Sequence, residues 1–392
     1  MKQTDSTTKN GSAPQLSETV LFCLYYTLAC AYIPLCAFLN IGAMAVSVIS
    51  LAVCVLGVAV MARAAGSFKA VLGYALILGI FIFFGGSLTP AGMFSAFATA
   101  VCIYAHLHLK RPSPFLWGLP AIPLIITLLI TGSATASVIS VISLPAAIAL
   151  MLAVKETAGK VGAICRISFG ICLSAVAVFA CAVYSAYGSI SFALCKQAID
   201  TAREVITELV LLGAREMEVL LGSSLSMLGE DEVAYAVGVV FNVLPAVTVI
   251  IANVAAYVIH SMFLSIRFVT VEEKKQALPM LSFEMSLASA IVFLLALLLS
   301  FVLVSDSAAM YGAVAENIML ILVPGLILTA LAGIRALAMH KGPSCLGTVV
   351  YLGAIFLIAS LSPPVIIIAA TVGAVLIIAT HAARHKAGKS NE

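Results

Sequence analysis

Charge is scarce in this chain. Lys, Arg, Asp and Glu together make up 9% of the 392 residues, whereas 63% of the residues are hydrophobic. A typical soluble protein carries about 25% charged residues and about 45–50% apolar ones. The composition therefore excludes an ordinary soluble enzyme, a disordered chain and a disulfide-stapled secreted module. The formal net charge of +3 gives no reason to expect a nucleic acid as a partner.

Motifs for catalysis, cofactor binding and metal binding are also missing. The pair Gly159-Lys160 lacks the upstream glycine of an ATP-binding Walker loop, and Val161 stands where that loop needs Ser or Thr. The sequence has no HExxH motif, no paired CxxC motif and no serine elbow. His381 and His385 are four residues apart, but no carboxylate or thiolate lies nearby. We therefore predict that the chain is not an enzyme and holds no cofactor and no metal.

Long hydrophobic runs are what the sequence does contain. Because a membrane-spanning helix uses roughly 20 apolar residues, the runs predict an all-α, polytopic transmembrane bundle of about 12 spans in a lipid bilayer, with ten or eleven spans also open. The expected spans are 19–38, 41–62, 69–86, 91–108, 115–131, 134–153, 163–187, 233–266, 282–304, 316–339, 346–361 and 364–381. The last two are the least certain to be separate, since only Ser362-Pro363-Pro364 divides them.

The basic residues predict how the spans are oriented. Connections between spans alternate between uncharged and basic, and 17 of the 20 Lys and Arg residues fall on one side. Since cytoplasmic loops are enriched in these residues, we expect a multi-pass protein of the inner or plasma membrane with both termini in the cytoplasm. The predicted parts are a polar tail (1–18), a seven-span domain (19–187), an extracytoplasmic segment (188–232), a five-span domain (233–381) and a basic tail (382–392).

The segment 188–232 predicts one amphipathic helix outside the membrane. Apolar or small residues recur there at steps of three and four, namely Ile199, Ala202, Ile206, Leu209, Gly213, Met217 and Leu220. The segment carries eight acidic residues against three basic ones, which disfavours anchoring to anionic lipid. Two interpretations stay open: the apolar stripe covers the outer ends of the bundle, or the helix acts as a lid or binds a partner.

Polar residues inside the C-terminal spans are the candidates for a solute path. Asn242 and Asn253 are eleven residues apart and share a helix face, with Pro245 between them. Asn317 begins a stretch that reaches Pro324-Gly325, where we expect a break near the middle of the membrane. Many transporters hold solutes at such breaks. The alternatives are hydrogen bonds that join helices and a kink that serves packing only.

One ion pair is expected near the cytoplasmic ends of two spans. Glu284 lies shortly after Pro279, and Arg335 lies six residues before Lys341. Pairing would neutralise two charges that are costly inside a membrane, and the pair could act as an inner gate. Alternatively, the long side chain of Arg335 reaches the membrane surface by itself.

The layout resembles the YybS-like family of bacterial integral membrane proteins. The resemblance rests on short-looped N-terminal spans, an outer helix ending in Arg215-Glu-Met-Glu218, Met227-Leu-Gly-Glu-Asp-Glu232, Leu244-Pro245-Ala246, Leu278-Pro279, the stretch Asn317 to Leu326 and a Pro-containing C-terminal hairpin. The tail departs from the family, since it reads Thr380-His-Ala-Ala-Arg384 where an Asp is expected. The resemblance implies an N-terminal half like the substrate-binding S component of energy-coupling-factor transporters. Such components work with a separate coupling subunit and ATPases.

Two functions are therefore expected from the sequence. The first is a membrane protein that binds or transports a small solute as the membrane subunit of a multi-component transporter, with Asn242, Asn253, Asn317, Pro324 and Gly325 along the path. The alternative is a membrane scaffold or regulator that does not transport but recruits a partner. An exposed apolar patch on residues 195–222 would favour the second function.

Overall fold

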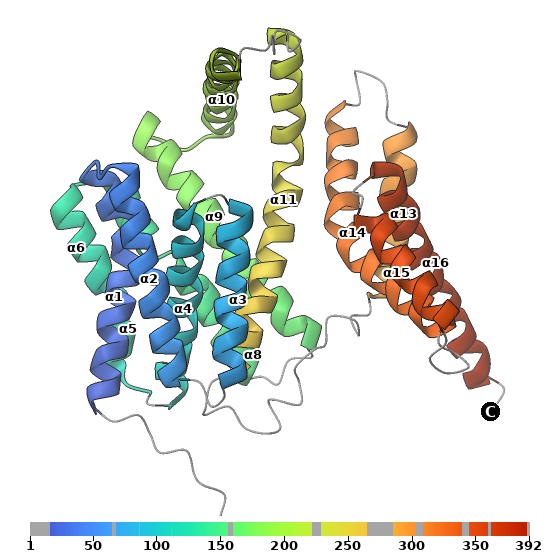
Figure 1. Cartoon of the computed structure of the whole chain (residues 1–392), viewed down its shortest axis with the longest axis horizontal. Helices are drawn as coiled ribbons and strands as arrows, with labels where there is room; N and C mark the ends of the chain where they lie inside the picture. Colours follow the sequence, from blue (N-terminus) through green and yellow to red (C-terminus); the bar gives the residue numbers. More distant parts are fainter. Residues whose placement is uncertain are drawn as a thin grey trace, which may run out of the picture. The chain divides into compact units, whose positions relative to one another are not determined.

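The structure, a computed structural model, describes residues 16–64, 68–85, 87–110, 112–155, 160–221, 229–264, 285–302, 309–338, 345–359 and 362–389. Within these ranges the regular secondary structure is entirely helical (Figure 1). The helices are α1 (Leu16–Phe38), α2 (Ala43–Ala64), α3 (Phe68–Gly85), α4 (Leu88–Lys110), α5 (Pro114–Gly118), α6 (Ala121–Thr131), α7 (Ala134–Ile139), α8 (Ser143–Lys155), α9 (Lys160–Tyr187), α10 (Phe192–Leu221), α11 (Glu230–Leu264), α13 (Leu287–Val302), α14 (Ala309–Ala338), α15 (Cys345–Ala359) and α16 (Pro363–Lys389).

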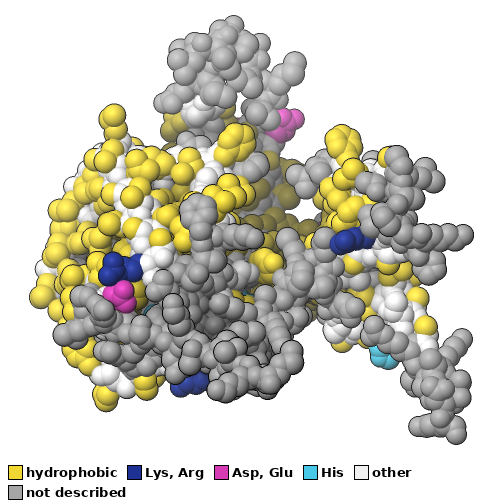
Figure 2. Space-filling model, turned by 60° about the horizontal axis from the view of Figure 1, so that its bottom comes forward, with side chains coloured by type: hydrophobic (Ala, Val, Ile, Leu, Met, Phe, Trp, Pro, Cys, Tyr) yellow, Lys and Arg dark blue, Asp and Glu magenta, His cyan; other side chains and the backbone are white. Residues whose placement is uncertain are grey.

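Length and composition identify the helices that can cross a membrane. Nine segments in the described ranges are long and apolar enough, and α13 is a shorter apolar helix. Large hydrophobic side chains are exposed on these helices, for example Leu24, Val55 and Phe169. Figure 2 shows such side chains covering much of the described surface. Since lipid is the solvent that accepts this surface, the prediction of an all-α, polytopic membrane protein is confirmed.

Several boundaries differ from the sequence prediction. The expected span 115–131 consists of α5 and α6, separated by a turn at Leu119 and Pro120. The expected span 134–153 consists of α7 and α8, separated by a turn from Ser140 to Ile142. The final hydrophobic stretch forms two helices, α15 and α16. The predicted helix within 188–232 is present as α10.

The predicted break at Pro324-Gly325 is not present. α14 starts at Ala309, seven residues before the expected span, and continues through both residues to Ala338. Pro324 lacks the N–H that would bond one turn back. The turn is packed all the same, because Leu326 is fully buried in the core between α13, α14 and α16. Pro324 therefore lies inside a continuous helix.

The chain divides into two compact units, described here separately. The first unit comprises residues 1–196 and 252–277, and the second comprises 197–251 and 278–392. The core of the first unit is built mainly by α1, α2, α4, α8 and the last turns of α11. The core of the second unit joins α13, α14 and α16. α11 contributes residues to both units.

Small residues let the helices of the first unit approach closely. Gly92 of α4 faces Ser50 of α2, so that a methyl group at Gly92 would lie 2.6 Å from the Ser50 Cβ atom. In the same way, a methyl group at Gly170 of α9 would lie 2.7 Å from the Pro145 carbonyl oxygen of α8. Close backbone contact of this kind is typical of helices packed within a membrane.

Candidate functional site

The structure brings together two of the predicted path residues, Asn242 of α11 and Asn317 of α14. The Asn317 Nδ2 group donates to the Asn242 carbonyl oxygen (2.7 Å), and the Asn317 Oδ1 atom accepts from the Ala246 N–H (2.9 Å). These two backbone groups face each other across one helical turn, beside Pro245. The same Nδ2 group donates to the Ala313 carbonyl oxygen of its own helix (2.8 Å). The Asn317 amide is thus fully engaged with backbone groups and joins α14 to α11.

Arg203 of α10 contacts the same part of α11. Its Nη2 group donates to the Asn242 Oδ1 atom at 3.5 Å. Its guanidinium also lies over Gly238, where a Cβ atom would be 3.7 Å from Cζ. Within the described ranges, the Arg203 Nε atom is buried without a hydrogen-bond partner, and no carboxylate forms an ion pair with this side chain. The contact places the middle of α10 against α11.

The other predicted residues lie apart from this contact. Asn253 is half-buried in the part of α11 that belongs to the first unit. Pro324 is exposed and Gly325 half-buried, two turns along α14 from Asn317. Arg335 is exposed in the last turn of α14. Glu284 lies outside the described residues, so its pairing with Arg335 stays a prediction.

Replacing Asn317 tests the contact between α11 and α14. We expect Asn317→Leu to lower the free energy of unfolding by about 1–3 kcal/mol, because it removes the partner of both Ala246 N–H and the Asn242 carbonyl. The control is Asn253→Leu, since no hydrogen bond to Asn253 is present within the described residues. Reversible unfolding in mixed micelles measures both effects. Equal losses for the two variants would contradict the role of the Asn317 amide.

A second polar cluster lies inside the first unit and was not predicted. It consists of four buried hydroxyl groups from three helices around Gly57 of α2, and we call it the hydroxyl cluster: Tyr25 of α1, Tyr74 of α3, and Ser95 and Thr99 of α4. The Tyr74 hydroxyl lies 2.7 Å from Ser95 Oγ and 2.8 Å from Thr99 Oγ1. The four side chains are between 0% and 5% exposed.

Gly57 provides the space that the hydroxyl cluster occupies. A Cβ atom at this position would lie 2.5 Å from Ser95 Oγ, 2.9 Å from Tyr25 Oη and 3.3 Å from Tyr74 Oη. Only a residue without a side chain fits here, so that three hydroxyl groups point at one small region of α2. The Tyr25 hydroxyl is buried there beside the Ser95 and Thr99 hydroxyl groups.

The same interface carries a second pair of hydroxyl groups farther along the helices. Tyr32 lies two turns after Tyr25 on α1, and Ser50 lies two turns before Gly57 on α2. Both hydroxyl groups are buried, and they lie beside each other. The interface between α1 and α2 therefore holds a second pair of buried hydroxyl groups.

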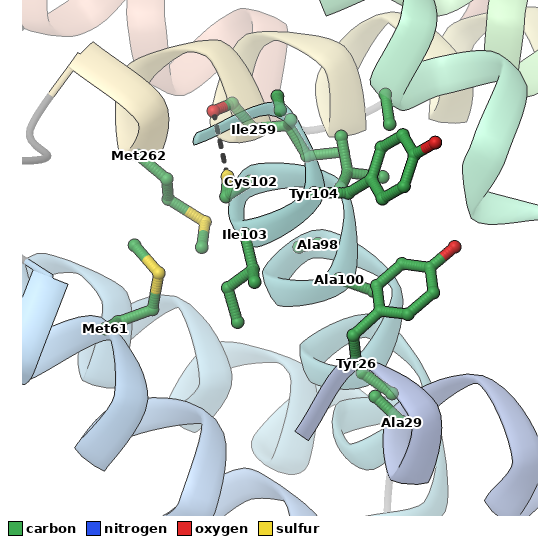
Figure 3. Packing of buried hydrophobic residues seen from close by; sticks show 14 of the residues in the cluster. Tyr26, Ala29, Met61, Ala98, Ala100, Cys102, Ile103, Tyr104, Ile259 and Met262 are labelled. Atoms are coloured by element: carbon green, nitrogen blue, oxygen red, sulfur yellow. Dashed lines mark hydrogen bonds between the residues drawn. The ribbon is translucent and has the colours of Figure 1, made fainter. Parts of the chain in front are cut away.

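A tyrosine pair and a histidine occupy another side of α1 and α4. Tyr26 stacks on Tyr104 with ring centroids 5.4 Å apart, and His108 lies 4.5 Å from Tyr104 and 4.5 Å from Trp117. Figure 3 shows the Tyr26 and Tyr104 hydroxyl groups pointing to the same side. It also shows the Cys102 thiol donating to the Ile259 carbonyl oxygen of α11 (3.7 Å). Tyr26 and Tyr104 are both part of the buried core of the first unit.

A surface groove and a search for metal-binding residues give no further candidate site among the described residues. A groove of about 500 Å³ between α8 and α9 is lined by Ala149, Leu152, Cys165, Arg166 and Phe169. It is open to the surface and mostly apolar, as expected for a lipid-facing crevice. Among the described residues, no group of three or more His, Cys, Asp or Glu could hold a metal ion.

The hydroxyl cluster escaped prediction for a specific reason. Ser95 and Thr99 are four residues apart and therefore share a face of α4, which was a usable signal. The tyrosines, however, lie within continuous apolar runs that do not reveal which side faces protein.

Compared with models of known protein families, with curated proteins and with solved structures, the chain matches none of them.

Proposed function

We propose that this membrane protein binds a small, polar, uncharged solute at the hydroxyl cluster. The observation that carries the proposal is the convergence of Tyr25, Tyr74 and Ser95 on Gly57, with Thr99 bonded to Tyr74. Three of the four helices concerned, α1, α2 and α4, are long and apolar enough to cross a membrane. Polar groups within a membrane are costly and are typically functional or join helices. The burial of four hydroxyl groups beside a single glycine favours the functional interpretation.

The chemistry of the cluster defines the class of solute. Hydroxyl groups both donate and accept hydrogen bonds, and none of the four side chains carries a charge at neutral pH. An ionic solute would find no countercharge there. A neutral compound with hydroxyl, amide or ring-nitrogen groups would match the hydrogen-bonding groups of the cluster.

Transport would require further proteins. The sequence has no ATP-binding loop, so a coupling subunit and ATPases would supply the energy, as the resemblance to the YybS-like family and to S components implies. In this proposal the chain is the membrane subunit of a multi-component transporter in the bacterial inner membrane, with cytoplasmic termini. The path residues Asn242, Asn253, Asn317, Pro324 and Gly325 remain predictions for the route of the solute.

Purification from native membranes tests the proposed binding. Small molecules released from the purified protein would be identified by mass spectrometry for the wild type, for Tyr74→Phe/Thr99→Val and for Ser47→Ala. The Ser47 hydroxyl bonds only to the Ala43 carbonyl of its own helix in the described structure, so this variant is the control. We expect one compound to be retained by the wild type and the control and lost from the double variant.

The alternative function is a scaffold or regulator that recruits a partner. The exposed apolar side chains of α10, which include Val205, Leu209 and Leu212, favour it over a purely structural role for that helix. Protein partners in the same preparation distinguish the two functions. ATPases and a coupling subunit would support transport, whereas other stable partners without a retained compound would support the scaffold.

A further inference from the structure

The apolar stripe of α10 has no protein partner within the described residues of its own unit. Ile199, Ile206 and Leu209 are 41%, 41% and 61% exposed. The helix instead contacts α11 through Arg203, which lies on the edge of the stripe. An exposed apolar stripe of this kind on a helix indicates contact with another protein or with lipid.

The contact with α11 fixes the depth of α10. A guanidinium is costly in hydrocarbon, so Gly238 and Asn242, which Arg203 contacts, lie at the level of the lipid headgroups. Roughly 20 residues cross the hydrocarbon core, and counting that number onward from Asn242 reaches the end of α11 at Leu264. α11 is thus long enough to span the membrane with its first turns outside.

The direction of α10 follows from the same contact. Figure 1 shows α10 nearly end-on where α11 runs in the plane of the picture, so the two helices cross steeply. If α11 crosses the membrane, α10 runs along its surface. The short link Gly188–Ser191 joins α10 to the end of α9, and four residues reach at most about 14 Å. The start of α10 is therefore also held near the surface.

We propose that α10 lies in the membrane interface with the stripe Ile199, Ile206 and Leu209 inserted among lipid acyl chains. Asp200, Glu204 and Glu208 lie on the other side of the helix and face water. Because acidic residues outnumber basic ones in this segment, the lipid is zwitterionic rather than anionic. Apolar burial holds the helix in the interface, to a depth of about 5–10 Å.

Fluorescence quenching in lipid vesicles tests this placement. The chain has a single tryptophan, Trp117, so Trp117→Phe provides a background without tryptophan. Leu209→Trp and Glu208→Trp are then made separately, and the full-length protein is reconstituted into phosphatidylcholine brominated near the top of its acyl chains. Glu208 is the matched control because it is exposed on the polar side.

The proposal predicts opposite results for the two variants. The Leu209→Trp signal should be quenched several-fold more strongly by brominated lipid than the Glu208→Trp signal, and iodide in the water should quench only the latter. Adding anionic lipid should leave the difference unchanged. Equal access of iodide to both positions would overturn the proposal. Protection of Leu209→Trp from both quenchers would also overturn it, in favour of a protein partner on the stripe.

Discussion

Gly373→Ala is expected to lower the free energy of unfolding by about 1–3 kcal/mol or more, as overpacking of a close contact does. Gly373 of α16 lies against the backbone of α14, where an added Cβ atom would overlap the Leu326 carbonyl oxygen and approach its carbon to 2.8 Å. Backbone atoms cannot turn away as a flexible side chain can. The two helices must therefore move apart, and the contacts of the surrounding core weaken.

Gly353→Ala is the matched control for this effect. Gly353 lies in α15 and has no heavy atom within 4 Å of an added Cβ atom. Alanine favours a helix over glycine by about 1 kcal/mol, so the control should be neutral or slightly more stable. Reversible unfolding in micelles, followed by circular dichroism, compares the two. Equal stability of both variants would show that α14 and α16 do not pack as described.

Gly57→Ala is expected to abolish solute retention at the hydroxyl cluster. The new methyl group would lie 2.5 Å from Ser95 Oγ and 2.9 Å from Tyr25 Oη, and it would fill the region where the hydroxyl groups converge. Retained compound, measured by mass spectrometry on the monodisperse fraction, should fall at least about tenfold, which corresponds to about 1.4 kcal/mol of binding free energy.

Two further variants separate lost binding from lost stability. Gly79→Ala in α3 is the control, because no atom lies within 4 Å of its added Cβ, and it should retain the compound. Ser95→Ala combined with Gly57→Ala removes the closest contact, so it should regain stability without regaining the compound. A double variant that binds as the wild type does would rule out the hydroxyl cluster as the binding site.

The sequence was informative where a single helix carries the signal. Long apolar runs and their flanking charges predicted the polytopic helical bundle, and the steps of three and four from Ile199 to Leu220 predicted α10. The turns inside the expected spans 115–131 and 134–153 were missed, because apolar composition continues through Leu119 and Ile142. Hydrophobicity alone does not distinguish a helix from a short irregular turn packed within the bundle.

The candidate sites were harder to predict because they depend on contacts distant in the chain. Asn242 and Asn317 were each singled out, yet nothing in the sequence shows that an amide 71 residues beyond Ala246 bonds its backbone N–H. The hydroxyl cluster likewise combines three helices. That Gly57 leaves space for these hydroxyl groups is visible only when α1, α3 and α4 are placed around it. Such contacts are set by tertiary packing, which local periodicity does not encode.

The turn between α6 and α7 bears on the biosynthesis of the protein. Gly132 adopts a left-handed backbone conformation (φ 64°), its N–H bonds the Leu128 carbonyl oxygen, and Ser133 already caps α7. α6 has 11 residues and is about 16 Å long, too short to cross a bilayer by itself. With no soluble loop between them, these two segments should leave the translocation channel together as one hairpin. An epitope tag inserted at Gly132 would therefore block insertion of the pair, rather than report the side of the membrane on which the turn lies.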